Sequence, residues 1–214
     1  MKNLLYKEFR LFWHPAMFLF LLFGTFLLIP SWPYFIAFGY IFIAFNTAFI
    51  ASRGNQDILL TVSFPVRKRD TVLAKVYLIV IVELLQVVIS IPFALINNAI
   101  YKGNMAGMNV NFAFYGLVLI MYALFNIIFL PMFYKTAYKV GVPVIVAILA
   151  VLVYIGVVNF AVLSIPYLKT NLNGLGVSHL GSQLLVLAAG IILFLGTTPL
   201  VYRMSAQKFE KVDL

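Results

Sequence analysis

Glu83 and Gln86 are the side chains of this sequence with the clearest chemical potential, because both interrupt a long apolar stretch. Their three-residue spacing places them on one face of a helix. An acid in apolar surroundings can carry a proton, which suits proton-coupled transport. The same pair can instead be a hydrogen-bonded or protonated contact that fixes helix packing, or it can lie near a subunit interface. Both residues are therefore candidate functional polar groups.

No other group of residues assembles into a reactive site. The 214 residues include six carboxylates, two histidines and no cysteine. Disulfides, thiolate catalysis and cysteine-ligated zinc are thereby excluded. The sequence also lacks the glycine-rich phosphate loop that cradles a nucleotide. We expect no enzyme activity, no metal site and no cofactor in this chain.

The composition identifies the surroundings in which these residues lie. Hydrophobic residues make up 64% and charged residues 10% of the chain, and the mean hydropathy is +1.06. Soluble domains have about 45–50% apolar and about 25% charged residues, so a soluble enzyme is excluded. A membrane-spanning helix needs roughly 20 mainly apolar residues. We predict an all-α integral membrane protein with one transmembrane domain over residues 1–214, and its six spans lie at about residues 16–29, 34–51, 71–96, 112–134, 142–165 and 182–202.

Lysine and arginine positions set the predicted orientation. All but two of the 15 basic residues fall on one side of the predicted bundle, whereas Lys102 and Lys169 fall on the other. Cytoplasmic segments carry the excess of positive charge, so both termini are expected in the cytoplasm. His14 and His179 then border opposite membrane faces and cannot hold one metal ion together. The net charge of +9 thus reflects topology, and no nucleic-acid partner is expected.

Residues 1–14 have the pattern of a helix that lies on the membrane surface. Leu5, Phe9 and Phe12 recur at helical spacing, while the basic residues between them can face lipid headgroups. Those basic residues are Lys2, Lys7 and Arg10. A basic flank that merely sets topology is the alternative interpretation.

Residues 52–75 form the longest and most charged cytoplasmic connection. Three of its residues, Ile58, Leu59 and Val62, share one face of a short predicted helix. Asp57 lies in the first turn of that helix, where a carboxylate suits the helix dipole. Phe64 and Pro65 end it, the basic run 67–69 follows, and Asp70 can cap the next span. The apolar face must either fold onto the bilayer or be covered by a partner.

Taken in order, these segments resemble the membrane subunits of ABC-2-type exporters. The resemblance is carried by the basic amphipathic start (LYKEFR, residues 5–10), the two spans after it, the loop LTVSFPVRKRDTVLAKVY (residues 60–77) and the turn YKTAYK (residues 134–139). Small six-span permeases of low-GC Gram-positive bacteria often have leucine where this loop has Phe64, and Val76 is an insertion before Tyr77. Within that group the chain is most similar to the permeases of phenol-soluble modulin exporters.

The resemblance implies a bacterial plasma-membrane permease that pairs with a second permease chain, identical or related, and with two ATPase subunits that bind ATP and magnesium. The short cytoplasmic helix would be the coupling helix, with Ile58, Leu59 and Val62 packed on the ATPase beside Pro65, and Asp57 and Arg67 adding polar contacts. The phenylalanine and tyrosine counts of 21 and 12 favour an aromatic and aliphatic path for amphipathic or hydrophobic substrates, and peptides fit it well. A proton-coupled secondary transporter and a non-transporting anchor or sensor subunit are the alternatives.

Overall fold

The computed structural model describes residues 2–11, 15–63, 66–101, 103–175 and 179–212, and in these ranges the secondary structure is helical. Within these ranges, five helical segments are long and apolar enough to cross a membrane. They are Tyr34–Gly54 (α3, Tyr34–Gly39, with α4, Ile41–Gly54), α6 (Lys68–Ile100), α7 (Phe112–Tyr134), α8 (Gly141–Ser164) and α10 (Leu180–Glu210). The prediction of an all-α integral membrane protein is confirmed.

The first predicted span, 16–29, is a shorter and mixed element. It consists of α2 (Pro15–Leu21) followed by a 3-10 helix, η1 (Leu22–Leu28). A 3-10 helix rises about 2.0 Å per residue against about 1.5 Å in an α-helix, so the two pieces together extend roughly 25 Å. The tighter winding lets a short apolar stretch approach the hydrocarbon thickness of about 30 Å.

The other spans differ from prediction chiefly at their ends. The bounds of α7 coincide with the predicted 112–134, whereas α6 and α10 run past the predicted 71–96 and 182–202 because their polar ends remain helical outside the apolar stretch. The prediction that Asp70 caps the third span is wrong. Arg67 holds the N-cap position without a side-chain hydrogen bond, and Asp70 lies in the first turn, where its charge suits the helix dipole.

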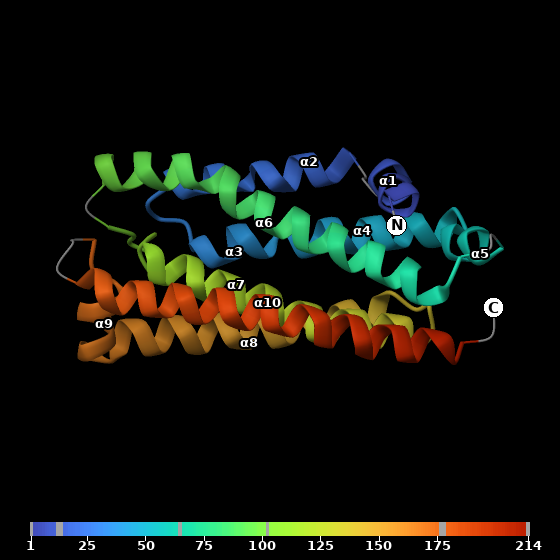
Figure 1. Cartoon of the computed structure of the whole chain (residues 1–214). Helices are drawn as coiled ribbons and strands as arrows, with labels where there is room; N and C mark the ends of the chain where they lie inside the picture. Colours follow the sequence, from blue (N-terminus) through green and yellow to red (C-terminus); the bar gives the residue numbers. More distant parts are fainter. Residues whose placement is uncertain (1, 12–14, 64–65, 102, 176–178, 213–214) are drawn as a thin grey trace.

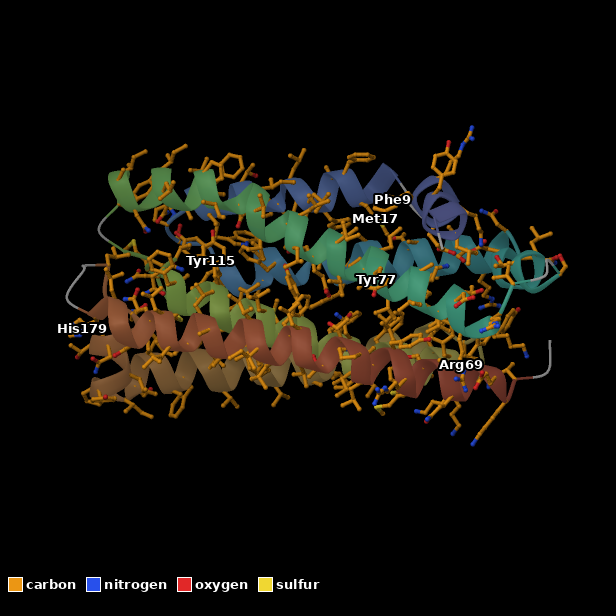
Figure 2. All side chains as sticks on the ribbon, viewed as in Figure 1. Phe9, Met17, Arg69, Tyr77, Tyr115 and His179 are labelled. Carbon is orange, nitrogen blue, oxygen red and sulfur yellow. The ribbon has the colours of Figure 1, made fainter. Side chains whose placement is uncertain are left out.

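Three short helices among the described residues lie outside the spans. They are α1 (Lys2–Leu11), α5 (Asp57–Val62) and α9 (Pro166–Leu172). Helix α9 lies between the fifth and sixth predicted spans, and Pro166 occupies its first position, which proline favours. Figure 1 shows α1, α5 and the end of α10 at one end of an elongated bundle, with α9 at the other. Arg69 and His179 mark these two ends in Figure 2.

An aromatic seam joins α3 and α4 to α7. Phenylalanines recur every three or four residues over 35–49 and every four residues over 125–133, so they form one stripe on each segment. The rings of Phe42 and Phe125 stack at 4.0 Å, and Phe49 meets Phe133 at 4.6 Å. Each such pair adds about 0.5–1.5 kcal/mol beyond its buried area. Much of the chain's aromatic content is thus used for internal packing, and the expectation that aromatic residues line a substrate path stays a prediction.

Two glycines allow α7 and α10 to approach most closely. A Cβ added at Gly190 would lie 2.3 Å from the Gly116 carbonyl oxygen, and one at Gly116 would lie 2.4 Å from that of Val186. Side chains do not tolerate such contacts with backbone atoms. Small residues at a helix crossing provide van der Waals contact where apolar burial alone gives no driving force in lipid. The close packing of α7 against α10 therefore depends on glycine at positions 116 and 190.

We expect Gly190→Ala to destabilise the bundle, because the added methyl forces two backbones apart and overpacking costs about 1–3 kcal/mol. Gly196→Ala in the same helix is the matched control, since a Cβ there meets no atom within 4 Å. Thermal unfolding of the purified protein in detergent measures both. Equal midpoints for the two variants would contradict the close crossing.

Candidate functional site

The connection between α4 and α6 places the predicted coupling helix at the cytoplasmic end of the bundle. Gln56 has a positive φ of 50°, an uncommon conformation for a residue with a side chain, and it turns the chain sharply into α5. Ile58, Leu59 and Val62 lie on this helix, but their side chains are outside the described residues, as is Pro65. Arg67 is exposed just before α6.

Asp57 belongs to a buried ion network. Its carboxylate oxygens lie 2.5 Å from Lys7 Nζ and 3.2 Å from Lys75 Nζ, and Ser52 Oγ donates a 3.0 Å hydrogen bond to it. Lys75 Nζ also lies 3.1 Å from Glu8. The two lysines balance the two carboxylates, so the cluster is neutral. Glu8, Asp57 and Lys75 are all under 10% exposed, so the network forms away from water.

The network connects elements that are far apart in the sequence. Lys7 and Glu8 come from α1, Ser52 from α4, Asp57 from α5 and Lys75 from the second turn of α6. Lys7 also donates a hydrogen bond to the Thr61 hydroxyl, which holds the far end of α5 to α1. The α5 helix is thus fastened at both ends, and its position follows that of α6.

Electrostatics keep Asp57 ionised in this setting. Burial alone would raise its pKa, but the charges of Lys75 and Lys7 and the hydrogen bonds from both lysines outweigh that effect, so the pKa lies below its usual 3.8. Asp57 faces inward and is 6% exposed. The polar contact of Asp57 with an ATPase, which the family resemblance implies, stays a prediction, and within the chain Asp57 pairs α5 with α1 and α6.

The sequence reasoning missed most of this network. Lys7 was assigned to lipid headgroups, and Lys75 counted only as a topology signal. The available signal was the place of Lys75 itself, inside the predicted third span at residues 71–96, where a buried cation requires a counter-charge. Leu60, which the prediction did not single out, is 58% exposed and presents apolar surface from α5.

Glu83 and Gln86 lie deep in the bundle, as predicted, and both are fully buried. Asn126 Nδ2 lies 3.1 and 2.9 Å from the two oxygens of Glu83, and Tyr122 donates a 2.6 Å hydrogen bond to Gln86. The partners come from α7, so these contacts bridge α6 to α7. No ion pair to Glu83 occurs among the described residues. Its surroundings are those of a hydrogen-bonded packing contact.

These two residues belong to a longer polar face of α6. At 100° per residue, the buried positions 75, 83, 86, 90 and 97 fall within an arc of about 80°. Ser90 lies 3.0 Å from the Tyr115 hydroxyl, and Asn97 donates a 2.9 Å hydrogen bond to the Tyr34 hydroxyl. One helix face therefore carries the polar contacts from the cytoplasmic network to the opposite end of the bundle.

The chain is a multi-pass integral membrane protein whose cytoplasmic helix α5 is fixed to a long spanning helix, and the described residues contain no group of three metal-binding side chains. The family model described as "ABC-2 family transporter protein" matches residues 3–210, so the chain belongs to the ABC-2 transporter family. It is the membrane component of an ABC transporter, located in the plasma membrane and partnered by an ABC ATPase. Neither the curated proteins nor the solved structures compared with the chain gave a match.

Lys75→Met is expected to loosen the cytoplasmic end of the bundle. The change leaves Glu8 and Asp57 buried with one cation between them, and breaking a buried pair costs about 3–5 kcal/mol. Arg69→Met is the matched control, because it removes an exposed pair with Glu210 that contributes little. Proteolysis of α1 and thermal unfolding in detergent report the effect. Equal protection of α1 in both variants would argue against the network as its anchor.

Proposed function

We propose that this chain is the permease of an ATP-driven exporter and that α5 transmits the movement of the ATPase to the membrane helices. The observation that carries the proposal is the ion network, because it makes α5 move with α6. A helix of 33 residues is about 50 Å long at 1.5 Å per residue, so α6 spans the membrane from end to end. Force applied to α5 is thereby delivered to one continuous helix.

The exposed surface of α5 supports ATPase docking. Leu60 presents apolar surface at the cytoplasmic end, and Ile58, Leu59 and Val62 occupy the same short helix. Pro65 and Arg67 follow it at the boundary with α6. We propose that this surface seats in the ATPase subunit, while Asp57 holds the helix from behind. ATP and magnesium would then be bound by the ATPase.

We further propose that two permease chains, identical or related, form the working unit and that the exported substrates are amphipathic or hydrophobic, with peptides the foremost class. The resemblance to phenol-soluble modulin exporters supports both points. Because many of the aromatic residues pack inside the bundle, the proposed substrate class rests on that resemblance.

Ile58→Asp and Leu59→Asp are expected to abolish co-purification with the ATPase, because a charge on the docking face cannot be desolvated without a partner. Tyr167→Asp is the matched control. It also places a charge on a short helix, but on α9 at the opposite end, where Tyr167 is 73% exposed. All three variants should retain the unfolding midpoint of the parent protein. Normal recovery of the ATPase with both α5 variants would place the docking surface elsewhere.

Vesicle transport with the ATPase separates the exporter from the proton-coupled alternative. We expect ATP-dependent accumulation of an amphipathic peptide that persists when the proton gradient is collapsed. Glu83→Gln should leave this transport unchanged, because an amide of the same shape can still accept a hydrogen bond from Asn126. Transport that needs a proton gradient and is lost in Glu83→Gln would favour the secondary transporter, and strong preference for a small polar solute would exclude the peptide class.

A further inference from the structure

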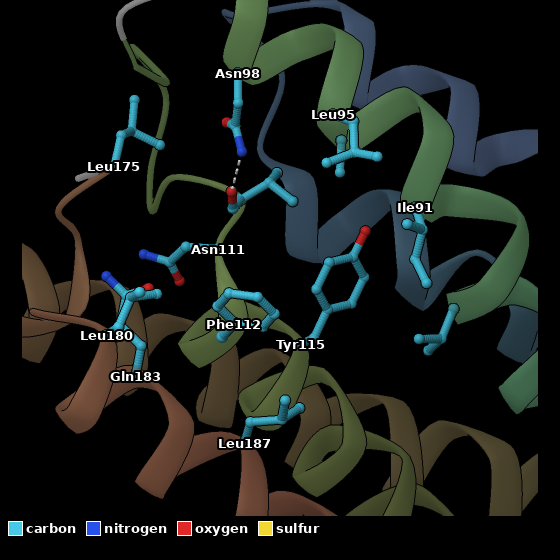
Figure 3. A pocket seen from close by; sticks show the side chains of 13 residues that line it. Ile91, Leu95, Asn98, Asn111, Phe112, Tyr115, Leu175, Leu180, Gln183 and Leu187 are labelled. Carbon is cyan, nitrogen blue, oxygen red and sulfur yellow. Dashed lines mark hydrogen bonds between the residues drawn. The ribbon is translucent and has the colours of Figure 1, made fainter. Parts of the chain in front are cut away.

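A cavity of about 510 Å³ lies between α6, α7 and α10 in the half of the bundle away from the ion network. Its volume falls within the roughly 300–1,000 Å³ of small-molecule sites. Figure 3 shows its walls, with Ile91 and Leu95 on α6, Phe112 and Tyr115 on α7, and Leu187 on α10. Most of the lining is aliphatic or aromatic, so its interior suits an apolar ligand.

The cavity opens sideways to the lipid. Ile91 and Leu95 line it and are 42% and 66% exposed, although they lie on a helix that crosses the membrane. Phe112 on the facing wall is 46% exposed. The material outside this opening is therefore the outer half of the bilayer, and a ligand can enter without crossing water.

Polar atoms gather at the outer end of the cavity. Asn98 donates a 2.8 Å hydrogen bond to the Val110 carbonyl, and Gln183 donates a 2.8 Å hydrogen bond to that of Gly174. These bonds use the amide nitrogens. The carbonyl oxygens of Asn98 and Gln183 have no hydrogen-bond donor among the described residues, although Gln183 is only 2% exposed. They offer two acceptors to a ligand.

The lining restricts the chemistry of the ligand. The described residues of the lining include no lysine, arginine, histidine, aspartate or glutamate, so a buried charge would find no partner among them. A peptide backbone would bring an N–H and a C=O with every residue, and these need hydrogen bonds away from water. An alkyl chain has no such groups along its length. A hydroxyl or amide N–H at its head matches the two free carbonyl oxygens.

We propose that this cavity binds one alkyl chain of an uncharged amphiphile from the outer leaflet, with a hydroxyl or amide head group held by Asn98 and Gln183. Tyr115 lines the site, and its hydroxyl pairs with Ser90 on the polar face of α6. The site is thus in direct contact with the helix that carries the coupling network. It is formed within a single chain and does not depend on the identity of the exported substrate.

Photo-crosslinking of the purified chain in phosphatidylcholine nanodiscs tests the proposal. The probe is a monoacylglycerol with a diazirine near the end of its chain, and mass spectrometry locates the labelled residues. We expect labels on the cavity walls that are competed by unlabelled monoacylglycerol and not by the fatty acid anion of equal length. Leu187→Trp should lower this labelling about tenfold by filling the site.

Leu185→Trp is the matched control, because Leu185 is 73% exposed on the same helix and does not line the cavity. Where Leu187→Trp fails to fold, Ile91→Trp fills the cavity from the α6 wall. Labelling that survives in a folded filled variant, or equal competition by the fatty acid, overturns the proposal. Stronger labelling by a diazirine-bearing amphipathic peptide would assign the cavity to peptide instead. The ATPase is not needed, so failure here leaves the exporter proposal standing.

Discussion

The buried charges around Lys75 are the constraint on which the cytoplasmic half of this protein depends. An ammonium group on a spanning helix is costly unless counter-charges surround it. Glu8 and Asp57 provide them, and in doing so they fix α1 and α5 to the start of α6. Because the buried charge of Lys75 must be paired, α1 and α5 are held to α6. Helix α5, which the ATPase is proposed to push, is therefore held against α6 and cannot slide past it.

The polar face of α6 continues this pairing of buried polar groups across the membrane. Each buried polar group on it has a partner from another element, and Glu83, Gln86 and Ser90 all reach α7. The hydrogen bonds specify how α6 is rotated about its axis, which apolar packing against lipid-like neighbours cannot do well. The aromatic seam and the Gly116–Gly190 crossing then hold α7 between α4 and α10. The bundle is thus apolar in bulk but oriented by a few polar contacts.

Sequence reasoning located the spans because hydropathy measures the same physics that places a helix in lipid. It missed the ends of α6 and α10 because a helix can continue after its apolar stretch ends. It also missed the 3-10 winding of η1, for which an all-apolar stretch gives no periodic signal. The short helix over residues 57–62 was predicted from local pattern and its coupling role from the family resemblance, whereas the link between Glu8 and Lys75 joins distant segments. Asn126 and Tyr122 share a helix face with Asn111 and Tyr115, within an arc of about 60°, and that spacing was the one local indication of the partners of Glu83 and Gln86.

The order in which the network is assembled has a consequence for biosynthesis. During synthesis Lys7 and Glu8 leave the ribosome long before Asp57 and Lys75, so α1 is made without its eventual partners. Its amphipathic character gives it a resting place on the headgroups in the meantime. The pairing of Glu8 with Lys75 requires both residues on the same side of the membrane, and a reversed third span would carry Lys75 to the far side. Docking of α1 thus depends on the orientation of α6, which is made later.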